Sequence, residues 1–323
     1  MHHLVIGEGQ IGRALIDLAL TEKDTVTVLR RTAVEPSPRI RRVSGDVLDH
    51  AALTDALTQA DAVHACFHAP YDARLWAREL PIRERAVLDA AAERGIPVVF
   101  PESLYSFQGE AISLAEGSTP TPRDAKGEVR EVLLAQRRAA PARTLSLVAS
   151  DLLGPTAIGT GAAVVCGMLL ERISAGSRAI VMGDPSAPHS LTFIPDLAAA
   201  MLHAARHAAR LAPSGDAVLH APSAPARTQS ELIVAASGLL GQRVRTPWTI
   251  PRLALKALSG VSTLARELHG IADLWYRPCE LRPGILTTEE GLAPTSWEEA
   301  LLLTAQHAAG RRVNGTAEHH PAV

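Results

Sequence analysis

The sequence contains few cysteines and no marked excess of charge of either sign. Its 323 residues include only Cys66, Cys166 and Cys279, which are far apart, and the net charge is −2. Such cysteines form no disulfide framework and fit a reducing compartment. Proteins that bind nucleic acids or membranes usually carry an excess of basic residues, and this sequence has none. We therefore expect a cytoplasmic protein without nucleic-acid or membrane partners.

Long apolar runs are also absent. The most apolar window, residues 161–170, stops at Glu171, well short of a membrane span. No apolar segment precedes the first predicted strand, which begins at His3. A secretory signal is therefore not expected at this end of the sequence.

A glycine-rich turn separates the first predicted strand from the first predicted helix. Gly7, Gly9 and Gly12 have G-x-G-x-x-G spacing after an apolar run and before an amphipathic one. The first glycine permits a tight turn, the second lets the backbone approach a pyrophosphate, and the third brings helix and strand together. The helix N-terminus then faces the anion. The spacing predicts a dinucleotide site formed by Gly7, Gly9, Gln10, Ile11 and Gly12.

Two arginines follow the second predicted strand, residues 25–29. In dinucleotide-binding folds this strand end faces the adenosine ribose, where a carboxylate favours NAD and an arginine favours NADP. The sequence has Arg30 and Arg31 there and no acidic residue. We therefore expect NADP as the cofactor, with NAD as the alternative. The competing interpretation is that both arginines are simply solvated.

Strands alternate with helices through the first half of the chain. This pattern predicts an α/β fold, a Rossmann-type doubly wound parallel sheet, with a smaller C-terminal α/β lobe that binds substrate. We expect an NAD(P)-binding domain over 1–155 with its sheet completed by parts of 178–225. A substrate lobe over 156–309 and a disordered tail over 310–323 should follow.

Particular helices are expected at several places. One should run over 74–94 with a kink or break at Pro81. Another should open at Gly159–Gly161 and extend to Ile173, and a third should span 252–268 without interruption.

Further motifs carry a family resemblance. They are Gly45-Asp46-Val47, 103–107, Lys126-Gly127, 150–155 and 183–196. With the glycine turn they resemble the extended, atypical branch of the short-chain dehydrogenase/reductase superfamily, the NAD-dependent epimerase/dehydratase-like group. The resemblance implies that Asp46 and Val47 flank the adenine and that the second lobe covers a small-molecule substrate. It also suggests a monomer or a homodimer paired through helices near 74–94 and 124–139.

The chain differs from that group at the positions of the catalytic residues. Family enzymes use Tyr-x-x-x-Lys, in which the tyrosine exchanges a proton and the lysine lowers its pKa and holds the nicotinamide ribose. Lys126 occupies the lysine position, but Pro122 occupies the tyrosine position, and proline cannot transfer a proton. The catalytic serine position is Pro101, and an arginine often found before the 150–155 motif is Val148.

Other residues are therefore candidates for catalysis. Tyr105 follows the fifth predicted strand and is the first choice as proton donor, with Lys126 as its activator. His68 has an ordinary pKa suited to acid–base work, but many such histidines only bind a loop carbonyl. Ser103 is suited to bind a substrate carbonyl or to cap the turn.

Four residues are candidates for substrate contact: Tyr71, Asp151, His189 and Trp275. Asp151 is more readily explained as a helix cap, and Trp275 as pocket wall or core. His64, Cys66 and His68 alternate on one strand, but no carboxylate lies near them in the sequence, and we expect no metal site.

Three functions remain open at this stage. The leading interpretation is an NADP-dependent reductase of a small, fairly apolar organic molecule, a role that suits bacterial secondary metabolism. The second is a non-catalytic NADP-binding sensor, which the missing tyrosine and serine favour. The third is an isomerase, dehydratase or cyclase that reuses the same pocket without redox chemistry.

Overall fold

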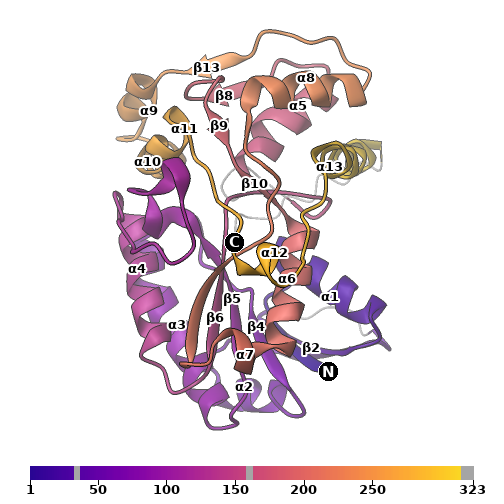
Figure 1. The fold of residues 1–323 in the computed structure, drawn as a ribbon, viewed down its shortest axis with the longest axis vertical. Helices are drawn as coiled ribbons and strands as arrows, with labels where there is room; N and C mark the ends of the chain where they lie inside the picture. The colour runs from indigo at the N-terminus through magenta and orange to yellow at the C-terminus, as the bar shows by residue number, and fades with distance from the viewer. Residues whose placement is uncertain (33–36, 158–162, 314–323) are drawn as a thin grey trace.

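A seven-stranded parallel sheet forms the centre of the molecule (Figure 1). The structure is a computed structural model, and it describes residues 1–32, 37–157 and 163–313. The strand order is β11-β6-β5-β4-β1-β2-β3. The strands are β1 (His2–Ile6), β2 (Thr25–Arg30), β3 (Ile40–Ser44), β4 (Ala62–Ala65), β5 (Val98–Ser103), β6 (Thr144–Ala149) and β11 (Asp216–His220). This topology confirms the predicted Rossmann-type fold.

The strand order reverses at β1, which lies between β2 and β4. In open parallel sheets, ligands bind beyond the carboxyl ends of the strands at such a reversal. The glycine turn directly follows β1. The fold therefore directs attention to the residues after β1, β2, β4 and β5.

Helices cover both faces of the sheet because its central strands are apolar on both sides. Val5 packs in one core with Leu15, whereas its neighbour Leu4 packs in another core with Leu53 and Val87. Alternate residues of a strand point to opposite faces, so both sides of β1 are buried. The covering helices are α1 (Gln10–Thr21) and α6 (Ile194–Arg206) on one face and α2 (His50–Ala56) and α3 (Ala73–Ala92) on the other, with α4 (Ala125–Arg138) packed against α3.

A buried ion network joins α3, α4 and β5. Arg137 contacts Glu84 and Glu102 at N–O distances of 2.6 Å each, and Arg130 binds the other oxygen of Glu102. All four side chains are nearly inaccessible to solvent. Buried charges persist only when they are paired and hydrogen-bonded. The network therefore fixes the positions of the two helices relative to the end of β5.

The second half of the chain forms many short elements, most of which lie above the carboxyl end of the sheet, whereas α7 lies beside the lower part of the sheet (Figure 1). They are β7 (Asp151–Leu153), η3 (Cys166–Leu170), α5 (Glu171–Ser174), β8 (Ile180–Met182), β9 (Pro188–His189), β10 (Leu191–Phe193), α7 (Ala208–Leu211), β12 (Arg227–Thr228), α8 (Gln229–Leu239), β13 (Trp248–Ile250), α9 (Arg252–Leu258), α10 (Thr263–Gly270), α11 (Ala272–Tyr276), α12 (Ile285–Thr288) and α13 (Trp297–Val313). Two short helical turns, η1 (Leu104–Phe107) and η2 (Ala111–Ser113), follow β5.

Three sequence predictions about helices need correction. The expected helix over 252–268 is two helices, because Gly260 interrupts it and the Ser262 hydroxyl caps α10 by accepting the N–H of Ala265. The predicted tail begins too early, since α13 continues to Val313, and residues 314–323 lie outside the described part. The break considered at Pro81 is absent, because α3 continues through it.

The expected helix start at Gly159–Gly161 lies outside the described residues. In the described ranges, no helix combines the length and the apolar character that crossing a bilayer requires.

Candidate functional site

The glycine turn is tight at its base and open at its tip. Gly7 has φ +94°, and a Cβ there would lie 2.9 Å from the carbonyl oxygen of Cys66. A Cβ on Gly12 would lie 2.1 Å from the carbonyl oxygen of Gly7. A Cβ on Gly9 would meet no heavy atom within 4 Å. Gly7 and Gly12 therefore allow close packing of the backbone, and Gly9 leaves space.

That space lies at the N-terminus of α1. Gly9 is the N-cap residue and provides no side-chain cap, and the first turn, which begins with Gln10 and Ile11, has no acidic residue. Helix N-termini present N–H groups and a positive dipole end, which favour an anion. The turn therefore has the shape and the polarity that a pyrophosphate requires.

Arginines and one carboxylate form the corner beside the turn. Glu8 pairs with Arg30 at 2.7 Å and with Arg42 at 3.0 Å, while Arg31 is exposed. Among the described residues, Nε and Nη1 of Arg42 are buried without a hydrogen-bond partner. Unused guanidinium donors are costly to bury unless a ligand binds them. Sequence reasoning missed Glu8 and Arg42, although β3 pairs with β2 and brings Arg42 to this corner.

Asp46 and Val47 follow β3, next to the same corner. Val47 is buried, whereas Asp46 is partly exposed. An Asp46 carboxylate oxygen accepts the N–H of Leu48 at 3.0 Å, and Arg83 lies 3.7 Å from the other oxygen. Both residues follow the carboxyl end of β3, beside the glycine turn's neighbouring strands.

Two tyrosines meet beyond β4 and β5. The hydroxyl oxygens of Tyr71 and Tyr105 are 3.2 Å apart. The Trp76 ring stacks on Tyr105 at a centroid distance of 6.2 Å and meets Tyr71 edge-on at 5.7 Å. Burial raises the pKa of both phenols, so both hydroxyls keep their protons at neutral pH. The arrangement can therefore donate a proton to a ligand.

Lys126 lies under these rings but is bound to α10. Its Nζ lies 5.1 Å from the ring centroid of Tyr71. It donates to the Glu267 carboxylate and to the Glu267 carbonyl oxygen at 2.8 Å each, and Asp124 is 3.3 Å away. The resemblance assigned this lysine to a nicotinamide ribose. In the structure its charge is neutralised by Glu267, 141 positions later in the chain, which no sequence signal identified.

His68 and Ser103, two further candidates, have different surroundings. His68 Nδ1 lies 2.8 Å from the carbonyl oxygen of Ala69, and its ring meets Trp76 edge-on. His68 is exposed at the surface, but desolvation of its ring lowers its pKa to about 4, so the ring is neutral near pH 7. This favours a structural role for His68. The Ser103 hydroxyl oxygen is buried without a hydrogen-bond partner among the described residues, which favours a ligand contact.

Asp151 is a half-buried carboxylate whose charge acts on Tyr105. It lies in β7 and accepts the N–H groups of Val164 and Val165 at 2.9 and 3.0 Å, so it is not the N-cap of a helix that follows it directly in the chain. Burial raises its pKa to about 7, despite those hydrogen bonds. Its negative charge also helps to raise the pKa of Tyr105. Asp151 is therefore positioned to change protonation state near neutral pH.

His189 and Trp275 form a separate group in the second lobe. Their rings stack at a centroid distance of 3.9 Å and an angle of 10°. His189 Nδ1 lies 3.0 Å from the carbonyl oxygen of Leu274, and burial lowers its pKa to about 4. Both side chains are buried and the His189 ring is neutral near pH 7, which argues against an acid–base role for the pair.

The strand residues weighed for a metal have other contacts. His64 Nε2 lies 3.0 Å from His3 Nδ1, and burial raises the pKa of the Cys66 thiol to about 12. No cluster of three or more His, Cys, Asp or Glu side chains suited to a metal occurs within residues 1–32, 37–157 and 163–313.

Comparisons with solved structures show the same fold. MoeE5 in complex with UDP-glucose and NAD is 19% identical, with a TM-score of 0.74 over 97% of this chain and 100% of that chain. UDP-glucose 4-epimerase from Thermotoga maritima is 18% identical, with a TM-score of 0.72 over 97% and 100% of the two chains. WbmG from Bordetella bronchiseptica, in complex with NAD and UDP, is 16% identical, with a TM-score of 0.74 over 99% of each.

The sequence itself gives the family. A search of curated proteins found no match. The model of the NAD dependent epimerase/dehydratase family matches residues 3–219, more than half of the chain. This confirms the resemblance that the motifs indicated, and the chain belongs to the NAD-dependent epimerase/dehydratase family.

Proposed function

We propose that this protein is a nicotinamide-dinucleotide-dependent reductase of a small, fairly apolar organic molecule. The observation that carries the proposal is the glycine turn, which is closely packed at Gly7 and Gly12 and open at Gly9. The similar structures MoeE5 and WbmG were solved with NAD, which supports a dinucleotide at the same fold position. The family contains epimerases and dehydratases, so the reaction must be argued from this chain's own residues.

The cofactor we propose is NADP rather than NAD. The corner beside the glycine turn, where the adenosine ribose would lie, contains three arginines (Arg30, Arg31 and Arg42) and one carboxylate (Glu8), so its net charge is +2. Two donors of Arg42 are buried there without partners in the described structure. A 2′-phosphate would satisfy those donors, whereas a 2′-hydroxyl would use at most one. NAD, named in the titles of similar structures, is the competing ligand.

The residues provide binding and one proton. When bound, the cofactor supplies the hydride. The Tyr105 hydroxyl donates a proton to the substrate oxygen, and Tyr71 holds that hydroxyl in place. The unpartnered Ser103 hydroxyl binds the same substrate oxygen. Asp151, with a pKa of about 7, is the nearby group suited to return the proton through solvent.

The substrate environment we propose is largely aromatic. The two tyrosines, backed by the buried Trp76 ring, form its aromatic side. Such walls favour an apolar molecule of the kind handled in bacterial secondary metabolism. The three cysteines are free thiols, which supports a cytoplasmic location.

The decisive experiment is a binding titration with Gly9→Ala. Because a Cβ at Gly9 meets no protein atom, the variant should fold normally. The same Cβ occupies the space that a pyrophosphate needs, so NADPH affinity should fall about tenfold or more. Gly238→Ala is the matched control, since it also adds a Cβ in open space, and its NADPH affinity should be unchanged. Unchanged NADPH binding by Gly9→Ala would contradict the proposal.

A second candidate function is a non-catalytic NADP-binding sensor. The observation that favours it is the ion pair of Lys126 with Glu267, which removes the lysine from the role that family enzymes give it. A sensor would bind NADPH but would not oxidise it with any member of a panel of apolar aldehydes and ketones. An isomerase or dehydratase would convert its substrate without net oxidation of NADPH.

A further inference from the structure

The end of the molecule opposite α2 is locally basic. Between Glu231 and Glu267 the sequence has no acidic residue but five basic ones. They are Arg243, Arg245, Arg252, Lys256 and Arg266. The net charge of −2 for the whole chain conceals this concentration of positive charge.

Two of these five cations are neutralised by protein carboxylates. Arg252 pairs with Asp273 at 2.8 Å, and Arg266 pairs with Asp72 at 2.9 Å. Arg243, Arg245 and Lys256 have no ion pair with any carboxylate in the described parts of the chain, and all three are exposed. Three positive charges are therefore available to a ligand at this end.

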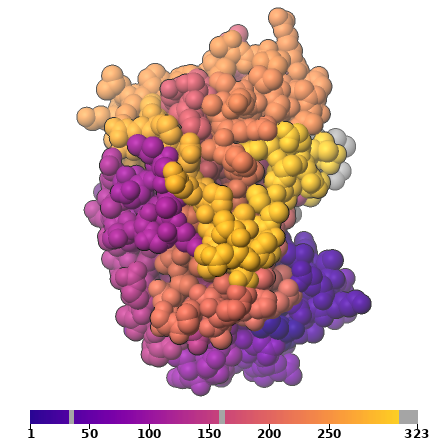
Figure 2. Space-filling view, viewed as in Figure 1, coloured from indigo at the N-terminus to yellow at the C-terminus, as the bar shows by residue number. Residues whose placement is uncertain are grey.

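Large apolar side chains protrude from the same segment. Val261 is 87% exposed and Leu253 is 79% exposed. The others, each about half exposed, are Val244, Trp248, Leu258 and Leu264. In Figures 1 and 2 the segment from the end of α8 through β13 to α9 forms the outermost surface at this end. We call these six residues and the three unpaired cations the basic apolar rim.

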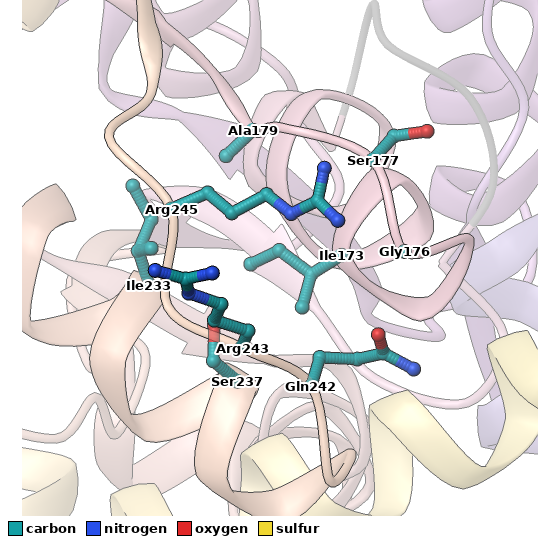
Figure 3. A pocket seen from close by; sticks show the side chains of 9 residues that line it. All are labelled: Ile173, Gly176, Ser177, Ala179, Ile233, Ser237, Gln242, Arg243 and Arg245. Carbon is teal, nitrogen blue, oxygen red and sulfur yellow. The ribbon is translucent and has the colours of Figure 1, made fainter.

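The basic apolar rim also borders a small cavity (Figure 3). Arg243 and Arg245 line it together with Ser177, Ser237 and Gln242, and Ile173 lies between the two arginine side chains. Guanidinium and hydroxyl donors around a small hollow are well matched to a phosphate group.

We propose that the basic apolar rim binds the surface of a bilayer that contains anionic lipids. Trp and Leu side chains enter the interface between headgroups and acyl chains, while Arg and Lys bind the headgroup phosphates. A second copy of the chain fits poorly, because a twofold contact would bring the unpaired cations of both copies together. Isolated protruding side chains also match a deformable bilayer better than a preformed protein groove. The association is peripheral and needs no membrane-spanning helix.

The inference does not depend on the proposed function, because vesicle binding requires neither nucleotide nor substrate. It does connect with the site, since α10 carries Leu264 on the rim and Glu267 against Lys126. A bilayer at the rim would therefore lie next to the helix that covers the tyrosine pair.

The test is co-sedimentation of the full chain with vesicles. Vesicles of equimolar phosphatidylcholine and phosphatidylglycerol should bind the protein about tenfold or more tightly than pure phosphatidylcholine vesicles. Raising the salt concentration from about 0.1 M to about 1 M should remove most of that difference, because the Debye length falls from about 10 Å to about 3 Å.

Variants separate the two parts of the rim. Leu253→Glu with Val261→Glu should weaken binding to the mixed vesicles about tenfold or more, and Arg243→Gln with Arg245→Gln should abolish most of the lipid preference. Leu48→Glu is the control, because this exposed leucine lies two residues before α2 at the opposite end (Figure 1), and it should bind as the wild type does. Equal thermal unfolding of all variants shows that they fold.

Three results would overturn the inference: no binding of the wild type to mixed vesicles, equal binding to both vesicle types, or an equal loss of binding in the Leu48→Glu control.

Discussion

The hydroxyl oxygens of Tyr71 and Tyr105 lie 3.2 Å apart, although 34 positions separate these residues in the chain. Tyr71 comes from the segment after β4, and Tyr105 comes from η1 after β5. Neighbouring parallel strands end at the same edge of a sheet, so their following loops meet there. The family's tyrosine position is proline, and we propose that this pair supplies the phenolic proton in its place.

Replacing Tyr105 by Phe tests whether this phenol donates the proton that the tyrosine donates in family enzymes. If Tyr105 is the proton donor, turnover of an accepted aldehyde or ketone should fall about 10²- to 10⁴-fold, while NADPH affinity stays the same. Tyr71→Phe should have a smaller effect, since it removes only the positioning hydrogen bond. The measurement is steady-state NADPH oxidation together with a binding titration. Equal turnover of Tyr105→Phe and wild type would assign proton transfer to another group.

The ribose corner gives a prediction about cofactor choice. Glu8→Gln removes the one negative charge that Arg30 and Arg42 contact. The ratio of NADPH affinity to NADH affinity should rise several-fold, because a 2′-phosphate then meets less repulsion. Arg42→Met should lower that ratio. Arg41→Met is the matched control, since Arg41 pairs with Asp55 instead. A ratio that stays constant in all three variants would remove the case for NADP.

Asp151 predicts a specific dependence of stability on pH. Its pKa rises from an ordinary 3.8 to about 7 in the folded protein, so the folded state binds a proton that the unfolded state releases. Its contribution to stability is present at low pH and is lost as the pH rises from about 4 to about 7. Relative to Asp151→Asn, the wild type should therefore lose stability across that range. Urea unfolding of both proteins at several pH values measures this difference, and a constant difference would contradict the raised pKa.

The buried ion network predicts an asymmetric effect of two neighbouring substitutions. Arg137→Met leaves Glu84 without its buried partner and should destabilise the fold by about 3–5 kcal/mol. Arg138→Met should change stability by less than about 1 kcal/mol, because Arg138 is 67% exposed and its contact with Asp216 is 3.8 Å long. Chemical denaturation of both variants gives the comparison. Similar stabilities would show that the network does not hold α3 and α4 in place.

The sequence predicted those features of the fold and the candidate site that depend on local sequence patterns. The glycine spacing, the apolar strands and the alternation with helices are short-range features, and they predicted the doubly wound parallel sheet. Tyr71 and Tyr105 could be expected near each other because loops after neighbouring parallel strands converge. These predictions required only the order of elements along the chain.

The sequence was less informative where partners come from distant segments. Glu267 reaches Lys126 from a helix of the second lobe, and Arg42 reaches Glu8 from a neighbouring strand. Neither residue belongs to a motif, and charge pairing across a fold leaves no spacing to recognise. The uninterrupted helix over 252–268 was wrong because apolar periodicity outweighed the local effect of Gly260.

The link between Lys126 and Glu267 has a kinetic consequence. It joins α4 to α10 by a buried contact beside the Tyr71 ring, so any motion that separates these two helices must break it. Parting them strips a buried ammonium of its counter-ion, which is slow compared with the motion of a free loop. Ligand exchange that requires this separation is then expected to be slow, and it should contribute to the overall rate together with the transfer of hydride and proton.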